Sequence, residues 1–434
     1  MKKFTSCALA VILSAAMLTG CGAPAANTGS SPASADKSGT GVTTITLWSH
    51  IDVNWNPAQD KMIADFEAAN PDIKVVRESF PYDEFESKTQ TSLLSKEGGA
   101  DVYQLWGGWA IDYSKTGAFA PVPDAYMAKV KEDSYEPVLG SFGYNGKYYG
   151  VPLEYNIEYG GLLVNTPKFK ELGIQYPTTW DEMINIAKKN SSSNGAVYNL
   201  RGLDFVGWDT LPYTWLSMIL SSGGSYMEGD KFNFNNPTGV ATMQKLVDYV
   251  TVDKMTNLDG LTNASETEPY QKLFTSTEEL MVPRGPWVVP EGINVDGLKY
   301  GQDFEYVAMP FYGSKKLFAA ETGWGLAVNA SSKKQEAAWK FVEFWTDPSR
   351  VLQYDIACGM LPASKTAANN PELVKAMPYM APLVKVLDGG RFIGYFNTDK
   401  LKENVKATFI DIVNNKTPVA EALGKLDSTM NAAK

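Results

Sequence analysis

Tryptophans placed beside acidic or very small residues are the part of this sequence best suited to binding a ligand. The chain has 11 Trp, and two short segments each hold a pair. Trp48 and Trp55 flank Asp52, and Trp106 and Trp109 flank two glycines that would let a ligand approach the backbone. An indole offers a large rigid apolar face, and a carboxylate accepts hydrogen bonds from hydroxyl groups. These segments therefore suit an uncharged ring with an apolar face and a polar rim.

The residues needed for metal binding and nucleophilic catalysis are scarce. There is one histidine, His50, and there are three cysteines, Cys7, Cys21 and Cys358. Histidine-based metal sites and Ser-His-Asp or Cys-His catalysis need several such residues to converge. We therefore expect no metal, no cofactor and no catalytic site of this kind. We interpret His50 as a hydrogen-bonding loop residue and Cys358 as a small buried hydrophobe.

Length and charge narrow the class of protein further. A chain of 434 residues is too long for one ordinary compact domain and comfortable for two. Its formal net charge is -10, and an acidic protein repels the phosphates of nucleic acids and anionic lipids. We expect two globular domains and no nucleic-acid partner.

The N-terminal segment resembles a bacterial lipoprotein leader followed by a tether. Two lysines precede an apolar run at 7–18, which fits a signal peptide and is too short to span a bilayer. Leu18-Thr19-Gly20-Cys21 then resembles the lipoprotein box, whose cysteine is acylated. We predict a signal peptide at 1–20, a lipid anchor on Cys21 and a disordered tether at 21–42 with a reach of about 25 Å. The alternative is an ordinary secretory signal with an incidental cysteine.

These predictions place the chain on the extracytoplasmic face of a bacterial cell membrane, held there by lipid alone. Residues after the tether contain no stretch approaching eighteen apolar residues, so we expect a soluble body. With Cys21 acylated and Cys7 removed, Cys358 would have no intrachain disulfide partner.

Strand and helix patterns alternate along the first part of the body. We predict strands at 44–48, 73–76 and 101–105, and helices at 56–70 and around 85–93. Asn56-Pro57 supplies a helix N-cap and a first-turn proline for the first helix. This order implies a mostly parallel sheet with helices on both faces, and ligands bind such sheets beyond the carboxyl ends of the strands. Both tryptophan-rich segments follow such ends.

Later segments repeat these patterns less regularly. A strand is predicted at 162–165, a helix ending near 172–173, an extended segment at 317–330 and a helix at 337–345. Thr179 and Glu182 form a predicted capping box at a helix start, so we interpret Trp180 as structural.

An ordered set of short motifs resembles the family 1 extracellular solute-binding proteins of ABC importers, the maltose-binding-protein-like group. The motifs are Ile45-Thr46-Leu47-Trp48, Asn70-Pro71-Asp72-Ile73-Lys74-Val75, Tyr149-Gly150-Val151-Pro152 followed by Asn165, Pro177-Thr178-Thr179-Trp180-Asp181-Glu182, Gly285-Pro286-Trp287, Ala308-Met309-Pro310, Gly323-Trp324-Gly325-Leu326-Ala327-Val328 and Gly359-Met360-Leu361-Pro362. No single motif is specific, but together they span almost the whole body in the family's order.

The resemblance implies an α/β, two-lobed periplasmic-binding-protein-like fold of type II, with mixed, mostly parallel sheets and an interlobe hinge. The chain would cross between lobes near 151–153, 320–324 and 359–361. The N-terminal lobe would then hold 43–151 and 325–358, and the C-terminal lobe 152–324 and 359–434. The implied function is to capture a small oligosaccharide between the lobes, without breaking any bond, and to deliver it to the transmembrane permease subunits. We expect a monomer.

Combining the resemblance with the residue types gives a set of candidate ligand contacts. Trp287 leads the set because the Gly-Pro-Trp motif matches a position where family members stack a sugar. The other candidates are Trp48, Asp52, Trp55, Trp106, Trp109, Glu154, Tyr155, Glu158, Trp208, Asp209, Tyr213, Trp324, Arg391 and Tyr395. Each has a structural alternative: Trp48 and Trp287 could be core, one of Trp106 and Trp109 is expected to fold inward, and Trp324 could pack in the hinge. The choice between Glu154 and Glu158 stays open.

Two other functions compete with this interpretation. A secreted glycoside hydrolase would need two carboxylates about 5 Å or 6.5–9.5 Å apart, and the sequence singles out no such pair among 49 acidic residues. The same fold could instead bind a polyamine in a carboxylate-dominated cleft, or an anion through clustered arginines. The many tryptophans and few basic residues in the candidate loops favour a neutral sugar.

Overall fold

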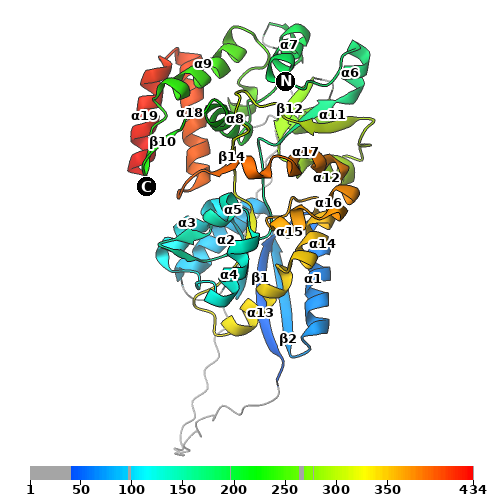
Figure 1. The fold of residues 1–434 in the computed structure, drawn as a ribbon, viewed down its shortest axis with the longest axis vertical. Helices are drawn as coiled ribbons and strands as arrows, with labels where there is room; N and C mark the ends of the chain where they lie inside the picture. The colour runs from blue at the N-terminus through cyan, green and yellow to red at the C-terminus, as the bar shows by residue number, and fades with distance from the viewer. Residues whose placement is uncertain (1–40, 96–98, 196, 263–267, 277, 434) are drawn as a thin grey trace, which may run out of the picture. The chain divides into compact units, whose positions relative to one another are not determined.

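The computed structural model describes residues 41–95, 99–195, 197–262, 268–276 and 278–433. Residues 42–434 form one compact unit, drawn in Figure 1. The predicted signal peptide, Cys21 and all but the last two residues of the predicted tether lie outside the described residues. No described helix combines the length and apolar character needed to cross a bilayer.

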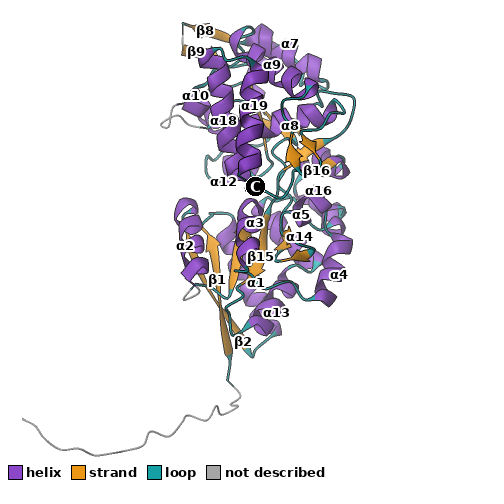
Figure 2. Cartoon of the chain, turned by 90° about the vertical axis from the view of Figure 1, so that its left-hand side faces the viewer, coloured by secondary structure: helices purple, strands orange, loops and turns teal. Residues whose placement is uncertain are grey.

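A five-stranded sheet with the order β2-β1-β3-β15-β6 builds the first core. Its strands are β1 (Thr43–His50), β2 (Ile73–Phe80), β3 (Val102–Trp106), β6 (Val151–Pro152) and β15 (Trp324–Val328). Strand β1 pairs in parallel with β2 and β3, whereas β15 runs antiparallel to β3 and β6. Helices α1 (Trp55–Ala69) and α2 (Tyr82–Ser95) connect the first three strands, as Figure 2 shows. The predicted alternation of parallel strands and helices is confirmed.

Helix α1 begins two residues earlier than Asn56-Pro57 predicts, because its N-cap is Asn54. One carboxylate oxygen of Asp52 accepts hydrogen bonds from the backbone N–H groups of Asn54 (2.7 Å) and Trp55 (3.1 Å). This turn satisfies two donors at the helix start, so the cap position falls on Asn54 and Asn56 lies in the first turn. The helix ends at Asn70, as predicted.

The chain near this sheet is mainly helical. Its further elements are α3 (Gly107–Thr116), α4 (Asp124–Asp133), α5 (Glu136–Gly140), β4 (Gly143–Tyr144), β5 (Lys147–Tyr148), α13 (Gln335–Trp345) and α14 (Pro348–Cys358). Helices α1, α13 and α14 pack against one another, and Phe66 meets Phe341 edge-to-face at 5.0 Å between ring centroids.

A three-stranded antiparallel sheet, β12-β7-β13, builds the second core. Its strands are β7 (Gly161–Asn165), β12 (Met281–Arg284) and β13 (Phe304–Ala308). The rest of the described chain contains the helices α6 (Thr166–Leu172), α7 (Trp180–Asn190), α8 (Thr210–Ser221), α9 (Pro237–Thr251), α10 (Asp259–Thr262), α11 (Pro269–Thr275), α12 (Val288–Asn294), α15 (Lys365–Ala368), α16 (Pro371–Ala376), α17 (Ala381–Val384), α18 (Thr398–Asn415) and α19 (Val419–Ala432). Short pieces complete it: β8 (Ser192–Asn194), β9 (Val197–Leu200), β10 (Met227–Glu228), β11 (Lys231–Phe232), β14 (Phe318–Ala320), β16 (Gly390–Phe392) and the 3-10 turns Pro378–Met380 and Leu387–Gly389.

The predicted capping box is present at the start of α7. The Thr179 hydroxyl accepts the Glu182 N–H, and the Glu182 carboxylate accepts the Thr179 N–H. The Trp180 indole N–H donates to the Tyr249 hydroxyl at 3.1 Å inside the core. The structural interpretation of Trp180 is confirmed.

Three segments far apart in the sequence form one hydrogen-bonded strip, which we call the crossing strip (residues 153–156, 322–324 and 361–363). The N–H groups of Leu153 and Asn156 donate to the carbonyls of Trp324 (2.9 Å) and Thr322 (2.9 Å). The Tyr155 N–H donates to the Leu361 carbonyl at 2.7 Å. These are the segments where crossings are expected, and they interrupt the single extended segment predicted at 317–330. The lobe boundaries themselves stay a prediction.

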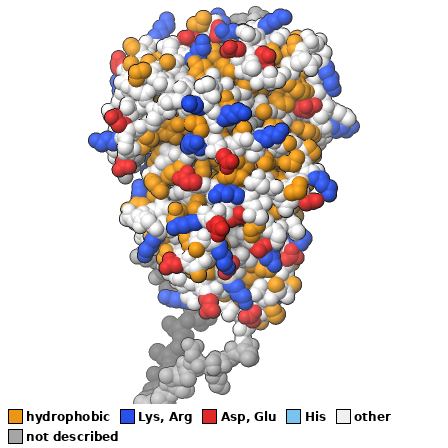
Figure 3. Space-filling model, viewed as in Figure 1, with side chains coloured by type: hydrophobic (Ala, Val, Ile, Leu, Met, Phe, Trp, Pro, Cys, Tyr) orange, Lys and Arg blue, Asp and Glu red, His pale blue; other side chains and the backbone are white. Residues whose placement is uncertain are grey.

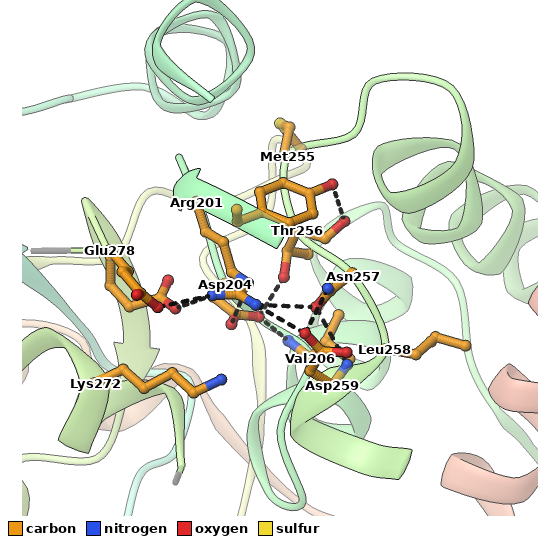
Figure 4. A network of polar contacts seen from close by, with 12 residues as sticks. Arg201, Asp204, Val206, Met255, Thr256, Asn257, Leu258, Asp259, Lys272 and Glu278 are labelled. Carbon is orange, nitrogen blue, oxygen red and sulfur yellow. Dashed lines mark hydrogen bonds and ion pairs between the residues drawn. The ribbon is translucent and has the colours of Figure 1, made fainter. Parts of the chain in front are cut away.

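A buried polar network lies away from the crossing strip, around Arg201 (Figure 4). The guanidinium contacts Glu279 at 3.2 Å, Asp259 at 3.0 Å and Glu278 at 3.7 Å, and Asp204 lies 4.0 Å away. Arg201 directly follows β9, and Glu279, which pairs with it in an isolated β-bridge, precedes β12. The network therefore links these two segments of the second core.

Charged side chains of both signs are interspersed on the face drawn in Figure 3. Lys and Arg do not gather there into one extended patch. A nucleic-acid partner needs a clustered basic footprint, and this face does not provide one.

Candidate ligand-binding cavity

A cavity of about 520 Å³ opens beside the crossing strip. It lies at the carboxyl ends of β1 and β3, where parallel sheets usually bind ligands. The β1–α1 loop, Trp106 and Trp324 line one side, and Trp208, Arg284 and Trp287 line the other. Its volume falls within the roughly 300–1,000 Å³ typical of small-molecule sites.

Aromatic side chains build one side, which we call the aromatic wall (His50, Trp55, Trp106 and Trp324). The Trp324 ring lies at the centre, with ring centroids 4.8 Å from His50, 5.5 Å from Trp106 and 5.7 Å from Trp55. Trp324 and Trp106 are paired residues of the neighbouring strands β15 and β3. Because the indoles are fixed by the sheet and by one another, they offer preorganised apolar faces to a ligand.

His50 differs from the loop hydrogen-bonding residue predicted. It is the last residue of β1, is largely buried, and its ring packs within the aromatic wall. Burial lowers the pKa of His50 to about 4, so the imidazole is neutral near pH 7.

Ion pairs build the opposite side, which we call the charged network (Glu158, Asp209, Arg284, Glu321 and Lys402). Asp209 lies 2.8 Å from both Arg284 and Lys402. Arg284 also contacts Glu158 at 3.4 Å, and Lys402 contacts Glu321 at 3.0 Å. Although burial alone would raise the pKa of Asp209, the charges of Lys402 and Arg284 lower it to about 2. Asp209 is therefore held as an ion between Arg284 and Lys402, whereas burial raises the pKa of Glu321 to about 8 despite its contact with Lys402.

Trp287 is held in the cavity by this network. Its indole N–H donates to Glu158 at 2.8 Å, and the Arg284 guanidinium lies over its ring at 4.9 Å from the centroid. Glu158 also accepts the Gly285 N–H at 3.1 Å and a hydrogen bond from the Asn156 amide at 3.0 Å. Glu158 therefore positions the indole, which stays only partly buried.

Glu154 and Glu158 both line the cavity, for one geometric reason. Along an extended segment, alternate side chains point to opposite sides. Glu154, Asn156 and Glu158 line the cavity, whereas Tyr155 and Ile157 between them are fully buried. Both glutamates therefore line the cavity, and which of them contacts a ligand stays a prediction.

Glu154 lies next to the aromatic wall. One of its carboxyl oxygens accepts the Trp324 N–H at 3.2 Å. Burial, together with the charges of Glu158 and Asp52, raises the pKa of Glu154 to about 8. At neutral pH this carboxyl is therefore mainly in its protonated form.

Six of the residues chosen from sequence lie outside the cavity lining. Trp48 packs edge-to-face on Phe80 and Tyr103, the Trp109 indole donates to Asp399 at 2.9 Å, and Tyr155 packs on Tyr135. Tyr213 is buried within α8, Arg391 donates to the carbonyls of Asp388 and Gly390, and Tyr395 is 55% exposed against Phe392. The expectation that one of Trp106 and Trp109 folds inward agrees with this placement, since Trp106 lines the cavity and Trp109 is 1% exposed. The other nine candidates line the cavity: Asp52, Trp55, Trp106, Glu154, Glu158, Trp208, Asp209, Trp287 and Trp324.

Sequence reasoning missed several polar residues of the cavity, four of which belong to the charged network or contact it. Arg284 directly precedes the Gly-Pro-Trp motif, Asn156 follows from the alternation that selects Glu154, and Glu321 lies at an expected crossing. These three had a local signal. Lys402 had none, because it lies on helix α18, 193 residues from its partner Asp209.

Cys358 is buried at the end of α14, as predicted, and it touches the cavity. Within the part of the chain that the structure describes, no three His, Cys, Asp or Glu side chains form a group suited to a metal ion.

Solved structures of other proteins share this fold. The GacH receptor of Streptomyces glaucescens GLA.O superposes with a TM-score of 0.74 at 19% identity, covering 90% of this chain and 98% of that one. Maltose-bound MalE3 of T. maritima superposes with a TM-score of 0.72 at 21% identity, covering 90% and 99%. The chain therefore has the two-lobed α/β fold that its motifs imply.

Proteins that resemble this chain in sequence are also binding proteins. The multiple sugar-binding protein of Streptococcus mutans serotype c is 27% identical over 312 residues, which cover 68% of this chain and 69% of that protein. The maltotriose-binding protein of Pyrococcus abyssi is 20% identical over 351 residues, covering 76% and 68%. The family model for bacterial extracellular solute-binding proteins matches residues 61–382, which is most of the chain. The chain belongs to the bacterial extracellular solute-binding proteins.

Proposed function

We propose that this protein captures a small oligosaccharide in the cavity and delivers it to the permease subunits of an ABC importer. The observation that carries the proposal is the pairing of an aromatic wall with a second side of partly exposed indole and fixed polar groups. A sugar ring has an apolar C–H face and a rim of hydroxyls, and this combination complements both. The names of the two relatives, one binding multiple sugars and one maltotriose, support the sugar class.

A screen of oligosaccharides by thermal shift, followed by calorimetry on the best ligand, tests this proposal. Binding to the native state raises its stability by mass action. We expect Trp287→Ala to weaken the best ligand at least tenfold, about 1.4 kcal/mol. Tyr395→Ala removes an exposed aromatic ring outside the cavity and serves as the control. A screen in which no sugar raises the melting temperature would contradict the proposal.

We propose that the cavity binds oligosaccharides without hydrolysing them. Glu158 and Asp209 are tied to Arg284 as ions and cannot act as a free acid and a free nucleophile without breaking those pairs. We therefore expect oligosaccharides to be recovered intact after incubation with the protein. Shortened products, absent with heat-denatured protein, would instead identify a glycoside hydrolase.

Anionic solutes fit this cavity poorly. Its two basic residues, Arg284 and Lys402, already contact carboxylates at 2.8 Å. A phosphate ester or organic acid would have to displace one of these pairs, at a cost of several kcal/mol for the buried charge left behind. We expect no stabilisation by sugar phosphates at concentrations where the parent sugar stabilises.

We also propose that the protein is a membrane-anchored lipoprotein acylated on Cys21. The leader and lipoprotein box of the sequence support this assignment. Metabolic labelling with a fatty acid in cells should label the native chain, and Cys21→Ser should abolish the label and move the protein from the membrane to the soluble fraction. An unchanged distribution would contradict the anchor.

A further inference from the structure

The charges that line the cavity are unevenly matched. Two basic side chains, Arg284 and Lys402, face six acidic ones: Asp52, Glu154, Glu158, Asp209, Glu291 and Glu321. Both basic side chains are committed, because Arg284 pairs with Asp209 and Glu158, and Lys402 pairs with Asp209 and Glu321. Asp52, Glu154 and Glu291 therefore form no ion pair with either basic side chain of the described lining.

Glu154 and Asp52 hold acceptor capacity that the protein does not use. One Glu154 oxygen accepts the Trp324 N–H, and its other oxygen accepts no hydrogen bond from any described residue. This side chain is only 4% exposed, yet it lines the cavity. Asp52 likewise uses one oxygen for the N–H groups of Asn54 and Trp55, while its second oxygen accepts none from the described part of the chain.

The two carboxyl groups are held by the backbones of two tryptophans that also line the cavity. The backbone donors that hold them belong to Trp324 and Trp55, whose ring centroids lie 5.7 Å apart in an edge-to-face arrangement. The face of an indole attracts a cation within about 6 Å of its centroid. Arg284 and Lys402 pair with Asp209 in the charged network, and the imidazole of His50, which packs against both rings, is neutral.

From this juxtaposition we propose that the captured sugar carries a protonated amine, bound between Glu154 and Asp52 against the rings of Trp55 and Trp324. The inference rests on the proposed function and names its substrate class, a small sugar with a basic amino group. An ammonium group supplies three donors and a positive charge, whereas a hydroxyl supplies one donor and no charge. The ring that bears the amine offers its C–H face to the indoles.

The proposal also predicts that Glu154 ionises when the amine binds, and the released proton can be measured. The titratable groups that influence this carboxyl are Asp52 and Glu158 beside it and Asp355 and Cys358 on α14. All four are neutral or negative, so none of them favours ionisation of Glu154. An arriving ammonium does favour it. Glu154 then loses its proton to the buffer, and the resulting carboxylate pairs with the ammonium.

Calorimetry with matched sugars tests the proposal. The ligands are a glucose disaccharide, its glucosamine analogue and its N-acetylglucosamine analogue, all in the linkage that binds best in the screen. We expect the glucosamine form to bind at least tenfold more tightly than both neutral forms at pH 7. Its binding enthalpy should also differ between two buffers of different ionisation enthalpy, which reports the released proton.

Three outcomes separate this inference from the proposed function. Equal or weaker binding of the amino form, with the neutral forms binding, would overturn the inference and leave sugar capture intact. Failure of all three sugars would overturn the sugar class itself. Tighter binding of the amino form without proton release would show that Glu154 does not ionise when the amine binds, and would overturn its assignment as the partner of the ammonium.

Two variants locate the amine. Glu154→Gln and Asp52→Asn should each bring the ratio of amino to neutral affinity close to one, and Glu403→Gln, an exposed acid on α18, should leave that ratio as in the native protein. Circular dichroism shows whether each variant folds. If one of the two does not fold, the other still tests the proposal. A ratio preserved in both folded variants would overturn the proposal.

Discussion

Arg284 is the residue on which most of the charged network depends. It is 4% exposed and contacts Asp209, Glu158 and the face of Trp287. A buried ion pair adds little stability when complete, but removing one partner leaves an uncompensated charge at a cost of about 3–5 kcal/mol. The arginine therefore acts as the counter-ion that allows Glu158 and Asp209 to line the cavity together.

We predict that Arg284→Met lowers the free energy of unfolding by about 3–5 kcal/mol, because Glu158 and Asp209 lose their shared counter-ion. Urea unfolding monitored by tryptophan fluorescence measures the change. Arg350→Met, which removes a partly exposed arginine that pairs with Asp347, should change stability by about 1 kcal/mol or less. Equal effects of the two substitutions would show that the buried network contributes no more than a surface ion pair.

Glu154 makes stability depend on pH in a defined direction. Burial raises its pKa to about 8 in the folded protein, above the ordinary value near 4.3 of an unfolded chain. Its contribution is fully present below pH 4 and is lost as pH rises toward 8, by at most about 1.4 kcal/mol per unit. Glu154→Gln removes this dependence. We predict that the variant matches the native protein at pH 4.5 and is the more stable of the two at pH 8.5, as urea unfolding at both pH values will measure. A difference that stays constant between these pH values would contradict the raised pKa.

At the scale of elements, the crossing strip fixes both the aromatic wall and Glu154. Gly323 lies where the strip is tightest, and a Cβ atom at this position would come within 1.9 Å of the Glu154 carbonyl oxygen. The neighbouring atoms are backbone, so they cannot move aside as a flexible side chain would. A side chain at Gly323 must therefore spread the strip.

We predict that Gly323→Ala destabilises the protein by about 1–3 kcal/mol and weakens sugar binding, since Trp324 and Glu154 shift together. Thermal unfolding and calorimetry measure the two effects. Gly424→Ala is the matched control, because its Cβ would meet only the Asn235 amide at 3.4 Å and alanine favours the interior of α19. Native-like affinity in Gly323→Ala would show that the strip does not position the cavity.

Local patterns predict the elements better than they predict the cavity. The strands β1 to β3 and their helices follow from apolar spacing and from turn residues, which act over a few positions. Glu154 and Glu158 follow from alternation once the segment is known to be extended. The pairing of Lys402 with Asp209, or of Trp109 with Asp399, depends on residues 193 and 290 positions apart, and no local pattern encodes such contacts. The motif resemblance locates Trp287, but not the ion pairs that hold it.

At the scale of the whole molecule, two cores contribute to one cavity. Trp55 belongs to the helix that follows β1 of the five-stranded sheet, and Trp287 follows β12 of the three-stranded sheet. A ligand shifts a conformational equilibrium only by its differential affinity for the two states. A sugar that contacts both indoles stabilises the arrangement in which both are near it, and one that contacts a single core does not.

This dependence predicts non-additive effects of Trp55→Ala and Trp287→Ala on sugar affinity. Each substitution alone should weaken the best ligand at least tenfold, about 1.4 kcal/mol, because losing one core's contact also lowers the population in which the other core engages. The double variant should then bind clearly more tightly than the product of the two single losses implies. Calorimetry on the native protein and the three variants gives the coupling energy, and the pair Trp287→Ala with Tyr395→Ala gives a cycle expected to be additive. Strict additivity between Trp55 and Trp287 would mean that the two sides bind the sugar independently, and joint closure on the ligand would have to be abandoned.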